Sequence, residues 1–316
     1  MVKPRRAFIA AESIRLHYLE WDPTLYRQTR PLTASQASQQ AQENEDNIPI
    51  VLLHGLSATA DTWNLVAEQL CKENLVIAFD QRGHGQSEQP DTCYDMITMA
   101  EDVIHAMAAL GLGQVVLVGH GWGARIALVL AARHPALLSH LILVDCPHVE
   151  PRYWPGMTRE RFLRERAGKE SYPSAEAFLK AMQEEIGNFW SPEIADILLT
   201  YIQQKPDGTV EERLKLSNQR QIRAATWEDR ALSYYGKITC PVLLVPAAAA
   251  PQAGEEPPER LENADEFAYA KGIMAVQVAR AIHQCTVLWM PDTAHDIQLQ
   301  RPQHLAQIIS DFIKEE

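Results

Sequence analysis

The segment Val115–Ala124 constrains the fold of this 316-residue chain more than any other part of it. It reads Val-Val-Leu-Val-Gly-His-Gly-Trp-Gly-Ala, an apolar run of strand length followed by glycine at every second position. A chain that turns sharply from a strand into a helix needs small residues on both sides of the turn, because a larger side chain would collide with the neighbouring backbone. Gly119 and Gly123 meet this need. The segment therefore predicts a strand, a tight turn centred on Gly121 and a helix.

Further short apolar runs, bounded by turn residues, indicate buried strands. Between most of them lie segments with apolar residues at helical spacing, such as 97–110 and 122–133. This alternation is typical of the α/β fold class, in which helices cover both faces of a mostly parallel, twisted sheet. The predicted strands are Ile50–Leu53, Leu75–Phe79, Val115–Val118, Leu141–Val144, Val242–Val245 and Thr286–Trp289.

The strand pattern stops after residue 146, and helical spacing predominates until about residue 237. We therefore predict a helical cap over 147–237, inserted between a first core part at 1–146 and a second at 238–316. A polar, low-complexity stretch at about 31–48 predicts a mobile surface loop, with a helix as the alternative because Gln, Ala and Glu are good helix formers.

The predicted cap has a high aromatic content, with Trp154, Phe162 and Trp190 among its members. A cap of this kind favours a small hydrophobic molecule as the ligand. Its predicted helices are 175–186, 192–203 and 211–223.

Charge and cysteine usage bear on the partners and the cellular setting. A net charge of −12 disfavours nucleic acid and anionic membrane surfaces as partners. The 5 cysteines are odd in number and widely spaced, which fits reduced thiols in the cytoplasm better than a disulfide framework. No uninterrupted apolar run has the length of a membrane span, so we expect a soluble, cytoplasmic protein.

Several motifs, in order along the chain, resemble those of the α/β-hydrolase superfamily, in particular its cap-bearing esterase, epoxide hydrolase, dehalogenase and haloperoxidase groups. His54-Gly55-Leu56 resembles the family's oxyanion loop, and residues 80–87 resemble its D-x-R-G-x-G-x-S turn. His295 follows the last predicted strand, where the family keeps its catalytic histidine. The turn at Gly121 corresponds to the family's nucleophile elbow, G-x-S-x-G. The resemblance covers roughly residues 50–312 and implies an α/β-hydrolase fold with an inserted cap.

The chain departs from the family pattern at the catalytic positions. Gly121 stands where the family has a serine or aspartate nucleophile. The usual acid follows the strand that matches Val242–Val245, but residues 246–251 read Pro-Ala-Ala-Ala-Ala-Pro. Some members carry the acid after the preceding strand, where this chain has Asp145. The candidate catalytic positions are therefore Gly121, His295 and Asp145, although a carboxylate that only caps the following turn is the alternative for Asp145.

In this family the oxyanion is bound by two backbone N–H groups, which survive side-chain changes. Here Leu56 and Trp122 would supply them. His120, beside the turn, is either part of the ligand site or packed beneath the turn. Ser57 and Ser87 are hydroxyls near the motifs, but neither lies on a predicted strained turn, and a loop or capping role is expected for both.

The residues indicate neither a catalytic metal nor a cofactor. No histidine pair has metal-ligand spacing, and the glycines at 83 and 85 lack the spacing of a phosphate-binding loop, so we interpret them as turn glycines.

Loss of a triad nucleophile leaves little serine-hydrolase activity. Three hypotheses follow: a diverged hydrolase that binds or slowly converts a small apolar ligand, an enzyme that uses His295 alone as general acid or base, and an ordinary hydrolase whose serine has been replaced by Gly121.

Overall fold

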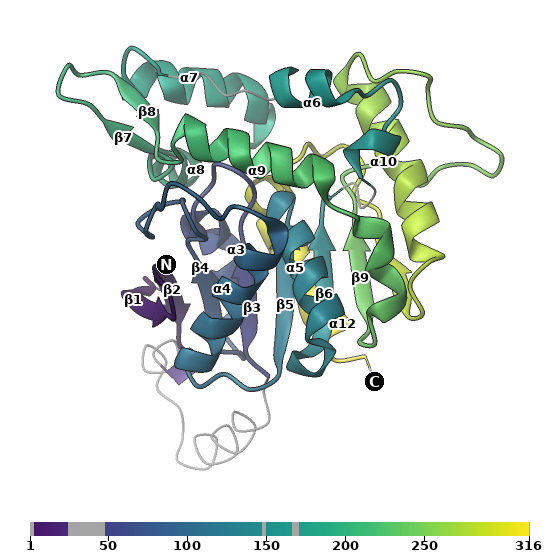
Figure 1. Cartoon of the computed structure of the whole chain (residues 1–316), viewed down its shortest axis with the longest axis horizontal. Coiled ribbons are helices and arrows are strands. Elements are labelled where there is room, and N and C mark those ends of the chain that lie inside the picture. Colours follow the sequence, from purple (N-terminus) through teal and green to yellow (C-terminus); the bar gives the residue numbers. More distant parts are fainter. Residues whose placement is uncertain (1–2, 25–47, 147–149, 166–170, 316) are drawn as a thin grey trace.

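An eight-stranded sheet crosses the centre of the computed structural model, which describes residues 3–24, 48–146, 150–165 and 171–315 (Figure 1). The two strand pairs that contain β2 are antiparallel, and the remaining neighbours run parallel. The predicted α/β class and mostly parallel sheet are confirmed. The loop predicted at about 31–48 lies almost entirely outside the described residues. In sheet order the strands are β1 (Arg5–Ala11), β2 (Ile14–Trp21), β4 (Val76–Phe79), β3 (Ile50–Leu53), β5 (Val115–His120), β6 (Leu138–Val144), β9 (Val242–Val245) and β10 (Cys285–Val287).

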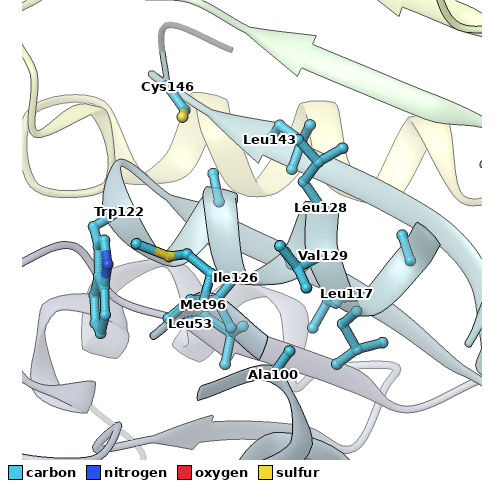
Figure 2. Packing of buried hydrophobic residues seen from close by; sticks show 14 of the residues in the cluster. Leu53, Met96, Ala100, Leu117, Trp122, Ile126, Leu128, Val129, Leu143 and Cys146 are labelled. Atoms are coloured by element: carbon cyan, nitrogen blue, oxygen red, sulfur yellow. The ribbon is translucent and has the colours of Figure 1, made fainter. Parts of the chain in front are cut away.

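Helices cover both faces of the sheet, because alternate residues of its strands point to opposite sides. In β3, Val51 and Leu53 belong to one buried hydrophobic cluster, and Ile50 and Leu52 belong to the other. The first cluster includes α4 (Met96–Ala109) and α5 (Trp122–Arg133), and the second includes α3 (Asn64–Leu70) and α12 (Pro302–Phe312). Figure 2 shows the first cluster, where Ile126 and Val129 of α5 lie beside Leu53 and Leu117 of the sheet.

The insertion between β6 and β9 lies across one end of the strands (Figure 1). Its helices are α6 (Arg159–Glu165), α7 (Ala175–Ile186), α8 (Pro192–Leu199) and α9 (Leu216–Glu228), and α10 (Ala264–Ala279) follows β9. Some of its aromatic residues form a separate cluster that includes Phe178, Phe189 and Trp190.

The prediction of a purely helical cap is wrong in one segment. A hairpin of β7 (Ile202–Gln204) and β8 (Val210–Glu212) separates α8 from α9, so the helices predicted at 192–203 and 211–223 are shortened at their facing ends. The reversal occurs at Pro206-Asp207-Gly208, where Gly208 has a φ of +88° that glycine adopts without strain. This turn chemistry outweighs the helical spacing of the flanking residues.

None of the helices in the described part of the chain is both long and apolar enough to cross a lipid bilayer.

Candidate functional site

The turn between β5 and α5 has the tight geometry that its glycines predict. A Cβ at Gly119 would lie 2.6 Å from Ala124 Cα, and one at Gly123 would lie 2.4 Å from the carbonyl oxygen of His54. Both are closer than real Cβ contacts, so neither position accepts a side chain without a shift of the backbone. Gly121 itself has φ 52° and ψ −114°, in the region that favours glycine.

His295 lies directly over this turn. A Cβ built on Gly121 would be 3.0 Å from His295 Nε2, while Nδ1 of the same ring lies 2.7 Å from Asp145 Oδ2. Asp145 follows β6 directly and is fully buried, and the His295 side chain is half exposed. Asp145 thus hydrogen-bonds the histidine ring and does not only cap the following turn.

Asp145 has a second partner that the sequence analysis missed. The ammonium group of Lys271, on α10, lies 2.7 Å from each carboxylate oxygen, and only 5% of its side chain is exposed. Burial acts to raise the pKa of Asp145, but the charge of Lys271 and the hydrogen bond with His295 outweigh it and hold that pKa well below its usual value. The sequence did contain one sign of a buried role for Lys271, because this lysine interrupts an otherwise apolar stretch of its helix.

The alanine run after β9 explains how Lys271 reaches the site. The Ala247 N–H donates to Asp145 Oδ1 at 2.8 Å, so this loop contributes an amide where the family has a carboxylate. On the facing side of α10, a Cβ at Gly272 would lie 3.0 Å from the Ala249 carbonyl oxygen. The small residues on both sides let the helix approach the loop closely.

His120 does not take the ligand-binding role considered for it. It is 2% exposed, and its Nε2–H donates to the His295 carbonyl oxygen at 2.9 Å, while the residues that line the neighbouring cavity do not include it. Burial, followed by the nearby His295, lowers its pKa to about 4, so the ring is neutral at pH 7. His120 therefore supports the backbone of the loop that carries His295.

A cavity of about 320 Å³ lies between this turn and the cap. Leu56, Gly121, Trp122 and His295 all line it, so four of the predicted site residues meet in one place. Trp122 is the first residue of α5, and the first amides of a helix have no acceptor within the helix. They are directed outward from the helix start, as an oxyanion site requires.

The two serines near the motifs have structural partners. Ser87 is buried, accepts a hydrogen bond from the His17 N–H and donates one to the Asp80 carbonyl oxygen. Ser57 lines the cavity, where it accepts a hydrogen bond from Gln219 Nε2 at 3.0 Å. Its φ is +65°, so the prediction that it does not lie on a strained turn is wrong.

The cap side of the cavity is mixed in character. Trp154 and Phe162 are apolar, whereas the remaining cap residues are polar or charged. The sequence analysis missed these polar residues, because three of them have a helical spacing that is equally typical of a solvent-exposed face and the fourth lies on β8. They are Glu212, Gln219, Arg223 and Thr226.

A family model described as the alpha/beta hydrolase fold matches residues 48–193. The crystal structure of E-2-(acetamidomethylene)succinate hydrolase superimposes on 98% of this chain and 99% of its own with a TM-score of 0.73, at 19% sequence identity. This chain has the α/β-hydrolase fold. The fold that the sequence motifs implied is thereby confirmed.

Among curated relatives, this hydrolase-fold protein is similar to the soluble epoxide hydrolase of Corynebacterium sp. (strain C12), with 39% identity over 97 residues. That match covers 31% of this chain and 34% of the relative, so it spans about a third of the relative's length. A longer match, 26% identical over 298 residues, covers 87% of this chain and 74% of Epoxide hydrolase 3 of Xenopus tropicalis.

Proposed function

We propose that this diverged hydrolase-fold protein binds a small ligand in the cavity and acts on it through the Asp145–His295 pair as general acid and base, without a serine intermediate. One observation carries the proposal: His295 Nδ1 lies 2.7 Å from Asp145, while Nε2 faces the space above Gly121. With the Nδ1 proton held by the carboxylate, the lone pair of Nε2 is directed at that space.

The cavity that Gly121 and His295 line would then hold a water molecule or an acidic group of the ligand beside Nε2. Nε2 would take a proton from either. Negative charge that develops on a ligand oxygen would be stabilised by the N–H groups of Leu56 and Trp122, which line the same cavity. A positioned base of this kind contributes about 10²–10⁴-fold to a rate.

A second candidate function is ligand binding without turnover, and Lys271 is the observation that favours it. In a catalytic triad the acid stabilises the histidine when it becomes an imidazolium. Here Lys271 contacts both oxygens of Asp145 and neutralises much of its charge. The pair would then hold the ring in place while supporting its protonation weakly.

Comparison of the native protein with His295→Ala on a panel of small esters, lactones and epoxides separates the two functions. Acid–base catalysis predicts a turnover loss of about 10²–10⁴-fold with ligand affinity largely retained. His283→Ala, at an exposed position, is the matched control and should keep full turnover. If the native protein binds panel members but converts none of them, the binding function holds instead.

The absence of a serine intermediate is tested separately with a serine-directed fluorophosphonate. The unmodified protein should not be labelled. Labelling at Ser57 or Ser87, located by mass spectrometry, would contradict the proposal.

A further inference from the structure

We propose that the ligand carries a carboxylate group that pairs with Arg223 on the cap side of the cavity. This inference rests on the proposed function, because it concerns the ligand of the same cavity. The observations behind it are the polar face of one cap helix, the charges that line the cavity and the cavity's size.

One face of α9 lines the cavity with polar side chains. Gln219, Arg223 and Thr226 are four and three positions apart, which places them on one side of the helix, and their exposed fractions are 4%, 6% and 8%. The buried face of a helix normally carries apolar residues. Gln219 Nε2 donates to Ser57 and Glu212, and the Thr226 hydroxyl donates to the Ile222 carbonyl oxygen. Arg223 is therefore the charged group that this buried polar face brings to the cavity.

The charges around the cavity favour a negative group. Arg125 and Arg223 line it with a single carboxylate, that of Glu212. Arg125 is held by Asp229, outside the lining, at 3.2 Å. Because Asp229 offsets the charge of Arg125, and because burial raises the pKa of Glu212, the guanidinium of Arg223 is the charge that a ligand anion would meet.

Glu212 has its own hydrogen-bond partners. Gln219 Nε2 lies 3.3 Å from Glu212 Oε2, and the Ser57 hydroxyl also hydrogen-bonds this carboxylate. Burial raises the pKa of Glu212, while Ser57 and the charge of Arg223 oppose the shift. Glu212 is thus hydrogen-bonded to Ser57, beside the oxyanion loop. Arg223 lies near Glu212, and its planar, charged guanidinium group can bind a carboxylate through two parallel hydrogen bonds.

The same cavity limits the size and the chemistry of the rest of the ligand. Its volume of about 320 Å³ holds a small molecule, with His295 on the core side and Arg223 on the cap side. Trp154 and Phe162 provide an apolar surface in the same lining. A short acyl or aryl-alkyl skeleton, with a carboxylate at one end and the reacting group at the other, fits the volume, the two opposed side chains and the apolar surface. It adds an anionic end to the apolar ligand that the cap aromatics predict.

The test compares carboxylates with their uncharged amides in calorimetric binding experiments, using the pairs hexanoate and hexanamide, and 4-phenylbutyrate and 4-phenylbutanamide. We expect at least one carboxylate to bind about 10-fold or more tightly than its amide, as charge-assisted hydrogen bonds imply. Arg223→Gln should abolish this preference. Arg220→Gln, on the exposed side of the same helix, removes the same charge and should keep it.

Two further variants keep the outcomes distinct. Arg223→Lys retains the charge without the planar fork and should show an intermediate preference, which also guards against a folding defect in Arg223→Gln. The preference should persist in His295→Ala, so a failure of catalysis leaves it intact. Equal affinity within every pair, no binding of either carboxylate, or a preference that survives in Arg223→Gln would overturn the proposal.

Discussion

The core wall and the cap wall of the cavity differ in what holds their residues in place. On the core wall, Gly121 and Trp122 lie where β5 ends and α5 begins, and backbone geometry alone determines their positions. On the cap wall, Gln219 and Arg223 project from α9, which follows the β7–β8 hairpin. Their placement depends on how the cap packs onto the core.

This difference suggests that the two walls have different functions. The core wall carries groups that transfer a proton or stabilise charge, and such groups need backbone-level precision. The cap wall carries side chains that select a ligand. Changes in the core wall should therefore alter chemistry or stability, and changes in the cap wall should alter affinity.

The largest effect that we expect comes from Gly121→Ser, which returns a hydroxyl to the core wall. Its Cβ would lie 3.0 Å from His295 Nε2, and the half-exposed ring can shift to accommodate it. Because Asp145 already orients that ring, we expect fluorophosphonate labelling and a gain in ester hydrolysis on the order of 10⁴-fold. Gly121→Ala adds the same Cβ without the hydroxyl and should gain neither. A folded serine variant that remains unlabelled would show that the remaining pair does not activate a nucleophile.

Lys271→Met should lower the free energy of unfolding by about 3–5 kcal/mol at pH 7, since it leaves the buried Asp145 carboxylate without its cation. The folded-state pKa of Asp145 is lowered, so its stabilising contribution is present above the unfolded pKa of about 3.9 and is lost as the pH falls below that value. Urea unfolding of the native protein and the variant measures the difference. Lys180→Met, at an exposed cap position, is the control, and an equal effect of both variants would contradict a special role for Lys271.

Gly123→Ala tests the backbone basis of the core wall. Its Cβ would meet the His54 carbonyl oxygen at 2.4 Å, so we expect a destabilisation of about 1–3 kcal/mol in thermal or urea unfolding. Gly113→Ala is the matched control, because nothing lies within 4 Å of a Cβ built there. If the two variants are equally stable, the turn is less tightly packed than its contacts indicate.

The last prediction concerns the support beneath His295, where an effect is expected only below about pH 6.5. His120 has a folded-state pKa of about 4, against about 6.5 when unfolded, so between these values the unfolded state binds the additional proton. Its contribution to stability is complete above pH 6.5 and falls towards pH 4, with a slope of up to about 1.4 kcal/mol per pH unit. In His120→Asn this part of the slope should disappear. Urea unfolding from pH 4.5 to 7.5 checks it, and an identical slope in both proteins would refute the assignment.

The fold class, the strand–turn–helix at Gly121 and the position of His295 were all predictable from the sequence. The fold class and the strand–turn–helix follow from local rules, namely apolar periodicity and the collision that a Cβ would cause at Gly119 or Gly123, whereas the position of His295 was implied by the resemblance to the hydrolase family. The resemblance to the hydrolase family added the order of the motifs.

Tertiary structure alone decided the partners of Asp145. His295 is 150 residues away from it in sequence and Lys271 is 126 residues away, and no local pattern brings them together. The same holds for the cap wall, where the spacing of Gln219 and Arg223 fits both an exposed face and a cavity face. Only the packing of α9 over the strand ends distinguishes the two, because burial is a property of the neighbours that a helix meets and not of its own sequence.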